Sequence, residues 1–156
     1  MHLHRLAPWA ACAVLALSFV APIHAEPLTG VQTVASPHDF STLVTKLEAA
    51  VVEHKMAVVA KASASQAAAA RGVKIPGNAV IMVFRNDYAV RMLKASVPAG
   101  IEAPLRFYVT ENANGKASLT WRTPSATFAA YGSAPLDEMA RELDPIFTAI
   151  ANDTVR

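Results

Sequence analysis

The spacing of apolar positions changes several times along the chain, and each change marks a predicted element. Alternation from Gly30 to Ala35 predicts a first strand, with Val31 and Thr33 on one side. The next apolar residues recur at helical spacing and predict a helix that ends near residues 54–55; they are Phe40, Leu43, Val44, Leu47 and Val51. Ser36-Pro37-His38-Asp39 predicts the helix start, because serine can accept a free backbone N–H and proline suits the first helical position.

The middle of the chain predicts two more strands separated by a short helix. Residues 56–60 form the first apolar run, and the alanine-rich residues 63–70 predict a helix closed by Gly72. Residues 79–84 are apolar at every position, which is typical of a central strand buried on both faces. Arg85-Asn86-Asp87 ends this strand, and residues 88–94 predict a helical turn.

A hairpin is the most sharply specified part of the chain. Apolar and polar residues alternate over 105–110 and again over 117–122. A three-residue loop, Ala113-Asn114-Gly115, pairs the apolar positions of one strand with those of the other and puts Gly115 where a left-handed residue is needed. In this register Arg106 lies opposite Arg122 on the polar face.

The last third of the domain predicts a short helical link and a terminal helix. The link covers residues 124–131, and apolar residues at helical spacing run from Leu136 to Ile150. Pro145 lies within that helix, and we expect a kink or break there with Asp144 capping the second piece.

The first 25 residues have the pattern of a secretory signal peptide. A short basic start precedes an apolar run from Leu6 to Val20, and small residues end at Ala25, where cleavage is expected. The run is short for a membrane span, although an uncleaved anchor is the alternative. We therefore expect a periplasmic protein with no stable membrane insertion after cleavage.

Composition excludes several function classes for the remaining 131 residues, which are the 156 of the chain less the 25 of the leader. The only cysteine, Cys12, lies in the leader, so no thiol, disulfide or thiolate metal site is expected. Without Arg5, 13 basic side chains face 12 acidic ones, and this balance gives no electrostatic case for nucleic acid. We expect the rest of the chain to consist of a tether and first strand at residues 26–35 and a single domain at residues 36–154.

Several of these pieces resemble the family called domain of unknown function 302, or DUF302. The resemblance covers roughly residues 36–150 and rests on the helix start at 36–47, the strand at 80–84 that ends at Asn86, and above all residues 103–115. The sequence departs from the family pattern at Arg85-Asn86-Asp87, where glycine, asparagine and proline are usual. It also departs at Ser63, which lies near a position where many family members carry a histidine. The resemblance implies an α+β fold of β-α-β(4)-α type, a curved antiparallel sheet of about five strands backed by two longer helices, with short helical inserts. It also implies frequent pairing as a dimer, and it supplies no reaction.

The polar face of the hairpin is the leading candidate site. Arg106 and Arg122 are flanked by the hydroxyls of Tyr108 and Thr120, and like charges opposite each other destabilise a strand pair unless something neutralises them. We predict a non-enzymatic binding or interaction module in which these residues, with Asn86 at the end of the buried strand, contact a small anionic ligand or a homodimer partner. The alternative is a solvated face whose arginines pair with Glu102, Glu111 or another carboxylate.

Metal and catalytic sites have less support. His38 and His54 lie about 24 Å apart along one predicted helix, so they cannot share an ion within a monomer, and no metal or cofactor is expected. No motif for a nucleophilic serine, a zinc protease or a phosphate loop occurs. The alternative function is a small hydrolase-like or isomerase-like enzyme with its site near Arg85-Asn86-Asp87, although a simple turn-forming role is favoured for Asn86 and Asp87.

Overall fold

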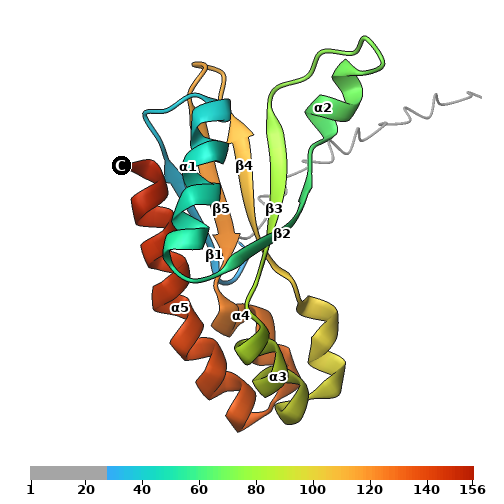
Figure 1. Cartoon of the computed structure of the whole chain (residues 1–156), viewed down its shortest axis with the longest axis vertical. Coiled ribbons are helices and arrows are strands. Elements are labelled where there is room, and N and C mark those ends of the chain that lie inside the picture. Colours follow the sequence, from blue (N-terminus) through green and yellow to red (C-terminus); the bar gives the residue numbers. More distant parts are fainter. Residues whose placement is uncertain (1–27) are drawn as a thin grey trace, which may run out of the picture.

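Five strands form one antiparallel sheet in the order β1-β5-β4-β3-β2 (Figure 1). The computed structural model describes residues 28–156, and the expected leader at 1–25 lies outside the described residues. The strands are β1 (Val31–Ala35), β2 (Ala57–Ala62), β3 (Asn78–Phe84), β4 (Leu105–Glu111) and β5 (Ala117–Arg122). The α+β fold with its five-stranded antiparallel sheet confirms the fold class expected from the sequence.

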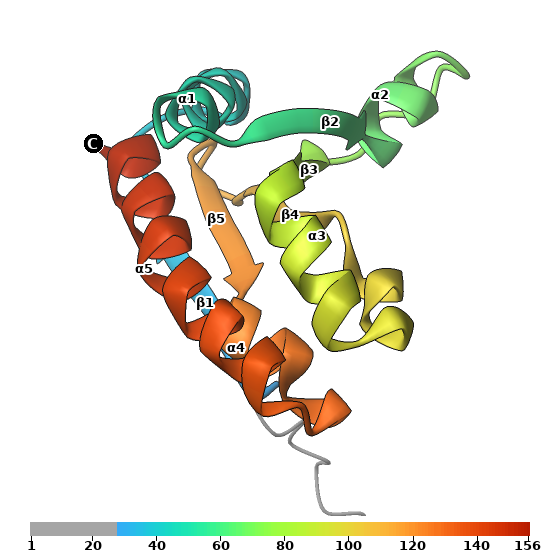
Figure 2. The ribbon, with the colours of Figure 1, turned by 60° about the horizontal axis from the view of Figure 1, so that its bottom comes forward.

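Helices connect and cover these strands. They are α1 (Phe40–Glu53), α2 (Ala64–Ala69), α3 (Asn86–Ala95), α4 (Pro124–Phe128) and α5 (Ala134–Val155), with 3-10 helices η1 (Val97–Glu102) and η2 (Ala129–Tyr131). The two longest, α1 and α5, pack against each other over one face of the sheet (Figures 1 and 2). At one end of β3 lies α2, whereas α3 and η1 lie at its other end (Figure 1). Among residues 28–156, no helix combines the length and apolar character needed to cross a membrane.

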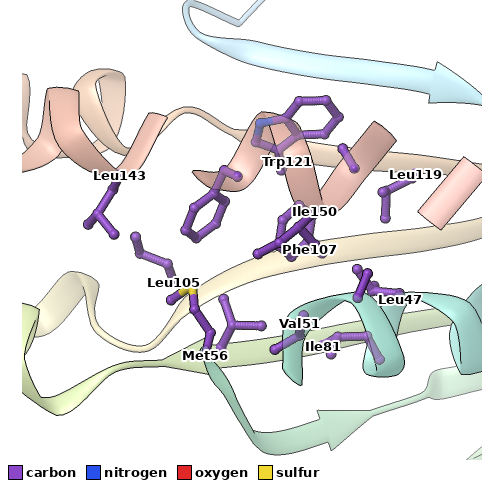
Figure 3. Close-up of a cluster of buried hydrophobic side chains, with 14 of the residues drawn as sticks. Leu47, Val51, Met56, Ile81, Leu105, Phe107, Leu119, Trp121, Leu143 and Ile150 are labelled. Carbon is purple, nitrogen blue, oxygen red and sulfur yellow. The ribbon is translucent and has the colours of Figure 1, made fainter. Parts of the chain in front are cut away.

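Alternation along each strand separates a covered face from an open face. In β4, Leu105, Phe107 and Val109 are buried, whereas Arg106 and Tyr108 are exposed. Phe107 lies at the centre of the core, where its ring stacks on that of Phe147 at 4.9 Å between centroids. Figure 3 shows the buried side chains of the sheet and of the two long helices gathered in one cluster.

The β4–β5 hairpin adopts the register predicted from its alternation. Phe107 pairs with Trp121 and Tyr108 with Thr120. The loop closes through a hydrogen bond from Asn112 N to Lys116 O at 2.7 Å, and Gly115 has a φ of 75°, the left-handed value that glycine adopts most readily.

Two predictions about helix and strand environments are wrong. The strand at 79–84 is buried on one face only, because α1 and α5 cover a single side and leave Val80 and Met82 half-buried on the other. The cap of α1 is Asp39 rather than Ser36: Asp39 Oδ1 accepts Thr42 N at 2.8 Å, and this bond chiefly holds the pKa of the Asp39 carboxyl below its usual value.

The expected break at Pro145 is also absent, and α5 runs through it as one helix. Pro145 and Arg141, the residue whose carbonyl loses its N–H partner, are both exposed, so water can satisfy that carbonyl. Asp144 caps a different helix from the one predicted. Its Oδ1 accepts Ser125 N, in the first turn of α4, at 2.9 Å.

Candidate functional site

Two arginines lie next to each other at one end of the open face. Continuing the β4–β5 register by one pair beyond Phe107 and Trp121 places Arg106 opposite Arg122. Both side chains are exposed, on the face that α1 and α5 leave uncovered. Their outer neighbours in the sheet are apolar, because Arg106 pairs with Met82 and Arg122 pairs with Val31. The positive charge of the open face is therefore concentrated on β4 and β5.

The carboxylates nearest to the two arginines in the sequence are hydrogen-bonded to other groups. Glu102 Oε1 accepts the hydroxyl of Tyr131 at 3.1 Å, and Glu111 Oε2 accepts Gly77 N at 2.7 Å. Within residues 28–156, neither arginine has a carboxylate oxygen within 4.0 Å. The ion pairs that would make this a neutral solvated face are thus not formed in the described part of the chain.

A small hollow brings the two arginines together with residues from two other elements. Arg106 and Arg122 line it with Glu102 from η1 and Thr127 from α4. One carboxylate among its lining residues faces two guanidinium groups, so the hollow carries a net positive charge. Burial raises the pKa of the Tyr131 hydroxyl, and the Glu102 carboxylate adds to this effect, so that hydroxyl stays a proton donor to Glu102.

A broader and shallower hollow extends the site across the open face. Arg106 lines it as well, together with Tyr108 and Thr120. Tyr108 is 42% exposed, and the hydroxyls of Thr120 and Thr33 form a hydrogen bond of 2.9 Å across β5 and β1. Four of the five predicted site residues, Arg106, Tyr108, Thr120 and Arg122, therefore share one surface.

Asn86 lies apart from those four residues. It begins α3, beyond the end of β3, and lines neither hollow. The neighbouring Arg85 precedes α3 and contacts its first turn: its Nε donates to Asp87 Oδ1 at 2.8 Å, and its Cζ lies 4.2 Å from the centre of the Tyr88 ring. The bond from Arg85 lowers the pKa of the Asp87 carboxyl. An enzyme site near Arg85-Asn86-Asp87, at the start of α3, stays a prediction.

The two histidines of the domain lie in different surroundings. His54 Nε2 lies 2.8 Å from Asp153 Oδ2, and this contact links α1 to α5 and chiefly lowers the pKa of Asp153. His38 precedes α1, and its Nε2 is buried without a hydrogen-bond partner in the described structure. Across residues 28–156, His, Asp and Glu side chains form no group of three or more that could hold a metal ion.

Comparison with known proteins identifies the family. The family model described as domain of unknown function DUF302 matches residues 32–152. The chain belongs to the DUF302 family. The fold of this DUF302 protein is similar to the crystal structure of an uncharacterised conserved DUF302 protein from Bacillus stearothermophilus, with a TM-score of 0.73. The two chains are 18% identical, over 82% of this chain and 99% of the other. No curated protein matches the chain.

Sequence reasoning missed part of the hollow that holds the two arginines. Glu102 entered only as an expected ion-pair partner, yet it lines the hollow and bonds to Tyr131 instead. Thr127 had no sequence signal, because it lies in a short helical link whose place beside β4 and β5 depends on the fold of the whole DUF302 domain.

Proposed function

We infer that this DUF302 protein is a non-enzymatic binding module, and that the open face of its sheet binds a small anionic ligand through Arg106 and Arg122. The observation that carries this inference is the pair of exposed guanidinium groups on adjacent strands, with no carboxylate within 4.0 Å in the described chain. Like charges that face each other across strands are unfavourable by themselves, and a bound anion removes the repulsion.

The chemistry of the site favours a carboxylate or phosphate group. Guanidinium groups donate two parallel hydrogen bonds to such groups, and two guanidiniums side by side match a ligand with several anionic oxygens. Tyr108 and Thr120, which share the adjoining hollow with Arg106, can bond to hydroxyl or carbonyl groups elsewhere on the ligand. The single carboxylate of Glu102 beside the arginines disfavours a densely charged polyanion such as nucleic acid.

Self-association through the same face is a second candidate. Val80 and Met82 are apolar and half-buried on the open face of β3, and apolar side chains at a surface can mark an interaction site. A homodimer would cover these two side chains, and light scattering over a range of protein concentrations measures it independently of any ligand.

The proposed location of this activity is the periplasm. It rests on the signal-peptide pattern of residues 1–25, with cleavage after Ala25. Expression of the chain in a Gram-negative host, followed by fractionation and mass determination of the N-terminus, tests both export and the cleavage site.

A thermal-shift series tests the binding proposal. Phosphate, sulfate, citrate and succinate are added at matched ionic strength, with chloride as the reference anion. A ligand that prefers the folded state raises Tm, by an amount equivalent to about 2.7 kcal/mol at roughly 100 times its Kd. We expect at least one multivalent anion to raise Tm, and Arg106→Gln or Arg122→Gln to weaken its binding about tenfold, since a charge-assisted bond contributes about 1.5–3 kcal/mol.

The matched control is Arg141→Gln, which removes an exposed arginine from α5, on the covered side of the sheet. This variant should keep the anion response of the unmodified protein. Equal responses in all three variants would mean that the anions act on overall charge and would refute a site on β4 and β5.

A further inference from the structure

The open face of the sheet changes in character from one row of side chains to the next. The two arginines share a row with Met82, which pairs with Arg106. In the adjacent row, Ala62 pairs with Val80, and Val80 pairs with Tyr108. Side chains of directly paired residues lie on the same face, so this second row forms a continuous apolar and aromatic floor beside the charged row.

The broad hollow of the open face lies over this floor. Ala62, Val80 and Tyr108 line it, and Ala64 joins them from the start of α2, which follows β2 at the edge of the sheet (Figure 1). The hollow has a volume of about 570 Å³, within the range of small-molecule sites. Of the described residues that line it, only Arg106 is charged.

The small hollow beside it has a different capacity. It holds about 40 Å³, enough for a group little larger than a water molecule. Arg106 lines both hollows, whereas Arg122 lines the small one only. A ligand that uses both hollows therefore places a compact anionic group beside the two guanidiniums and the rest of its atoms on the apolar floor. A planar carboxylate needs less of this room than a phosphate does.

We propose that the two hollows form one site for a small aromatic carboxylate, whose carboxylate lies between Arg106 and Arg122 and whose ring lies flat on Val80 and Tyr108. This inference rests on the proposed function and names the ligand class for the same face. A flat body covers more of a broad, shallow floor than a globular one of equal size. The Tyr108 side chain is 42% exposed, and it offers a ring partner for stacking.

The charges of the open face favour a small anion over a second copy of the chain. Across the described strands β3, β4 and β5, no open-face position holds an acidic residue. Two such faces in contact would bury arginines from both copies without supplying carboxylates to pair with them, and unpaired buried charges are costly. An aromatic carboxylate supplies the missing charge and covers the apolar floor at once.

Calorimetric titration with 2-naphthoate tests the ligand class. Two comparison compounds each change one property: 2-naphthalenemethanol lacks the charge, and 1-adamantanecarboxylate keeps the carboxylate and the number of non-hydrogen atoms but is globular. We expect 2-naphthoate to bind about tenfold more tightly than the alcohol, because the alcohol forms no charge-assisted bond. It should bind at least about threefold more tightly than the adamantane compound, which cannot stack on Tyr108.

A pair of variants on β2 tests the location of the ring. Ala62→Glu adds bulk and a carboxylate to an exposed position of the floor, and it should weaken 2-naphthoate binding about fivefold or more. The matched control is Ala57→Glu, also exposed, which does not line the hollow. Ala57 pairs with Phe84, one row beyond that of Arg106, so the added charge is as many rows from the arginine as in Ala62→Glu. This control should bind like the unmodified protein.

The outcomes separate this inference from the proposed function. Inorganic anions that respond to Arg106→Gln, together with 2-naphthoate that binds no more tightly than acetate, would overturn the aromatic site and keep the anion site. Equal weakening by Ala62→Glu and Ala57→Glu would also overturn it. A concentration-dependent dimer that excludes 2-naphthoate would assign this face to a second copy, and failure of every anion to bind would refute the proposed function as well.

Discussion

The two faces of the sheet are built from the same strands but have opposite chemistry. On the covered face, Phe107 and Leu119 are fully buried beneath α1 and α5. One residue further along each strand, on the open face, Tyr108 is exposed and its partner Thr120 is half-buried. Because side chains alternate along a strand, a single hairpin register decides both the core and the candidate binding surface.

The difference between the faces shows where the sequence departs from what stability alone requires. The covered face follows packing: its apolar side chains are buried in one core cluster with those of α1 and α5. The open face places Arg106 opposite Arg122, a pairing that disfavours the folded sheet and that any small polar residue would avoid. A feature that opposes stability at an exposed position is a reasonable marker of function.

The largest expected difference between the faces is in core packing. Phe107→Ala should lower the free energy of unfolding by about 3–5 kcal/mol, because it leaves a cavity beside Phe147 and Trp121. Tyr108→Ala, one residue away on the open face, should lower it by less than about 1 kcal/mol. Urea denaturation measures both, and equal losses would mean that the open face is covered in solution.

A smaller effect should come from repulsion between the arginines. Arg122→Thr keeps a strand-forming residue and removes one of the two charges, so we expect it to raise stability at low salt by roughly 0.5 kcal/mol. Added salt screens the repulsion in the unmodified protein, and the difference should shrink as ionic strength rises. A gain that does not depend on salt would show that Arg122 acts through something other than charge.

The smallest effect should appear in acid, on the covered side of the sheet. His54 holds the pKa of Asp153 below its ordinary value of 3.8, so this contact stabilises the fold fully above that pH and loses its effect as pH falls through the lowered pKa. Asp153→Asn should remove that part of the acid sensitivity. Urea midpoints measured on both sides of pH 3.8 should converge for the two proteins at the acid end, and parallel curves would contradict the linkage.

Local chemistry made the hairpin predictable. The alternation on both sides of the loop and the need for a left-handed residue at Gly115 agree on one register, and the structure has that register. The start and end of α2 were equally predictable from local chemistry, because Ser63 Oγ accepts a hydrogen bond from Gln66 N and Gly72 follows the last turn with a φ of 74°.

Features that depend on distant segments were not predictable from the sequence. Apolar residues on both sides of β3 suggested burial on both faces, but only the packing of α1 and α5 decides which face is covered. A proline predicts a helix break by local rules, yet Pro145 lies on the exposed side of α5, where water can satisfy the carbonyl that loses its hydrogen bond. The hollow beside the arginines likewise joins η1, α4 and two strands, and no local pattern links them.

A crystal of the protein soaked with selenate tests the central claim most directly, because anomalous scattering from selenium locates the anion without ambiguity. We predict selenate bridging the guanidinium groups of Arg106 and Arg122 on the open face, away from any lattice contact. Arginine side chains that instead pair with carboxylates of the same chain, with no anion between them, would contradict the account.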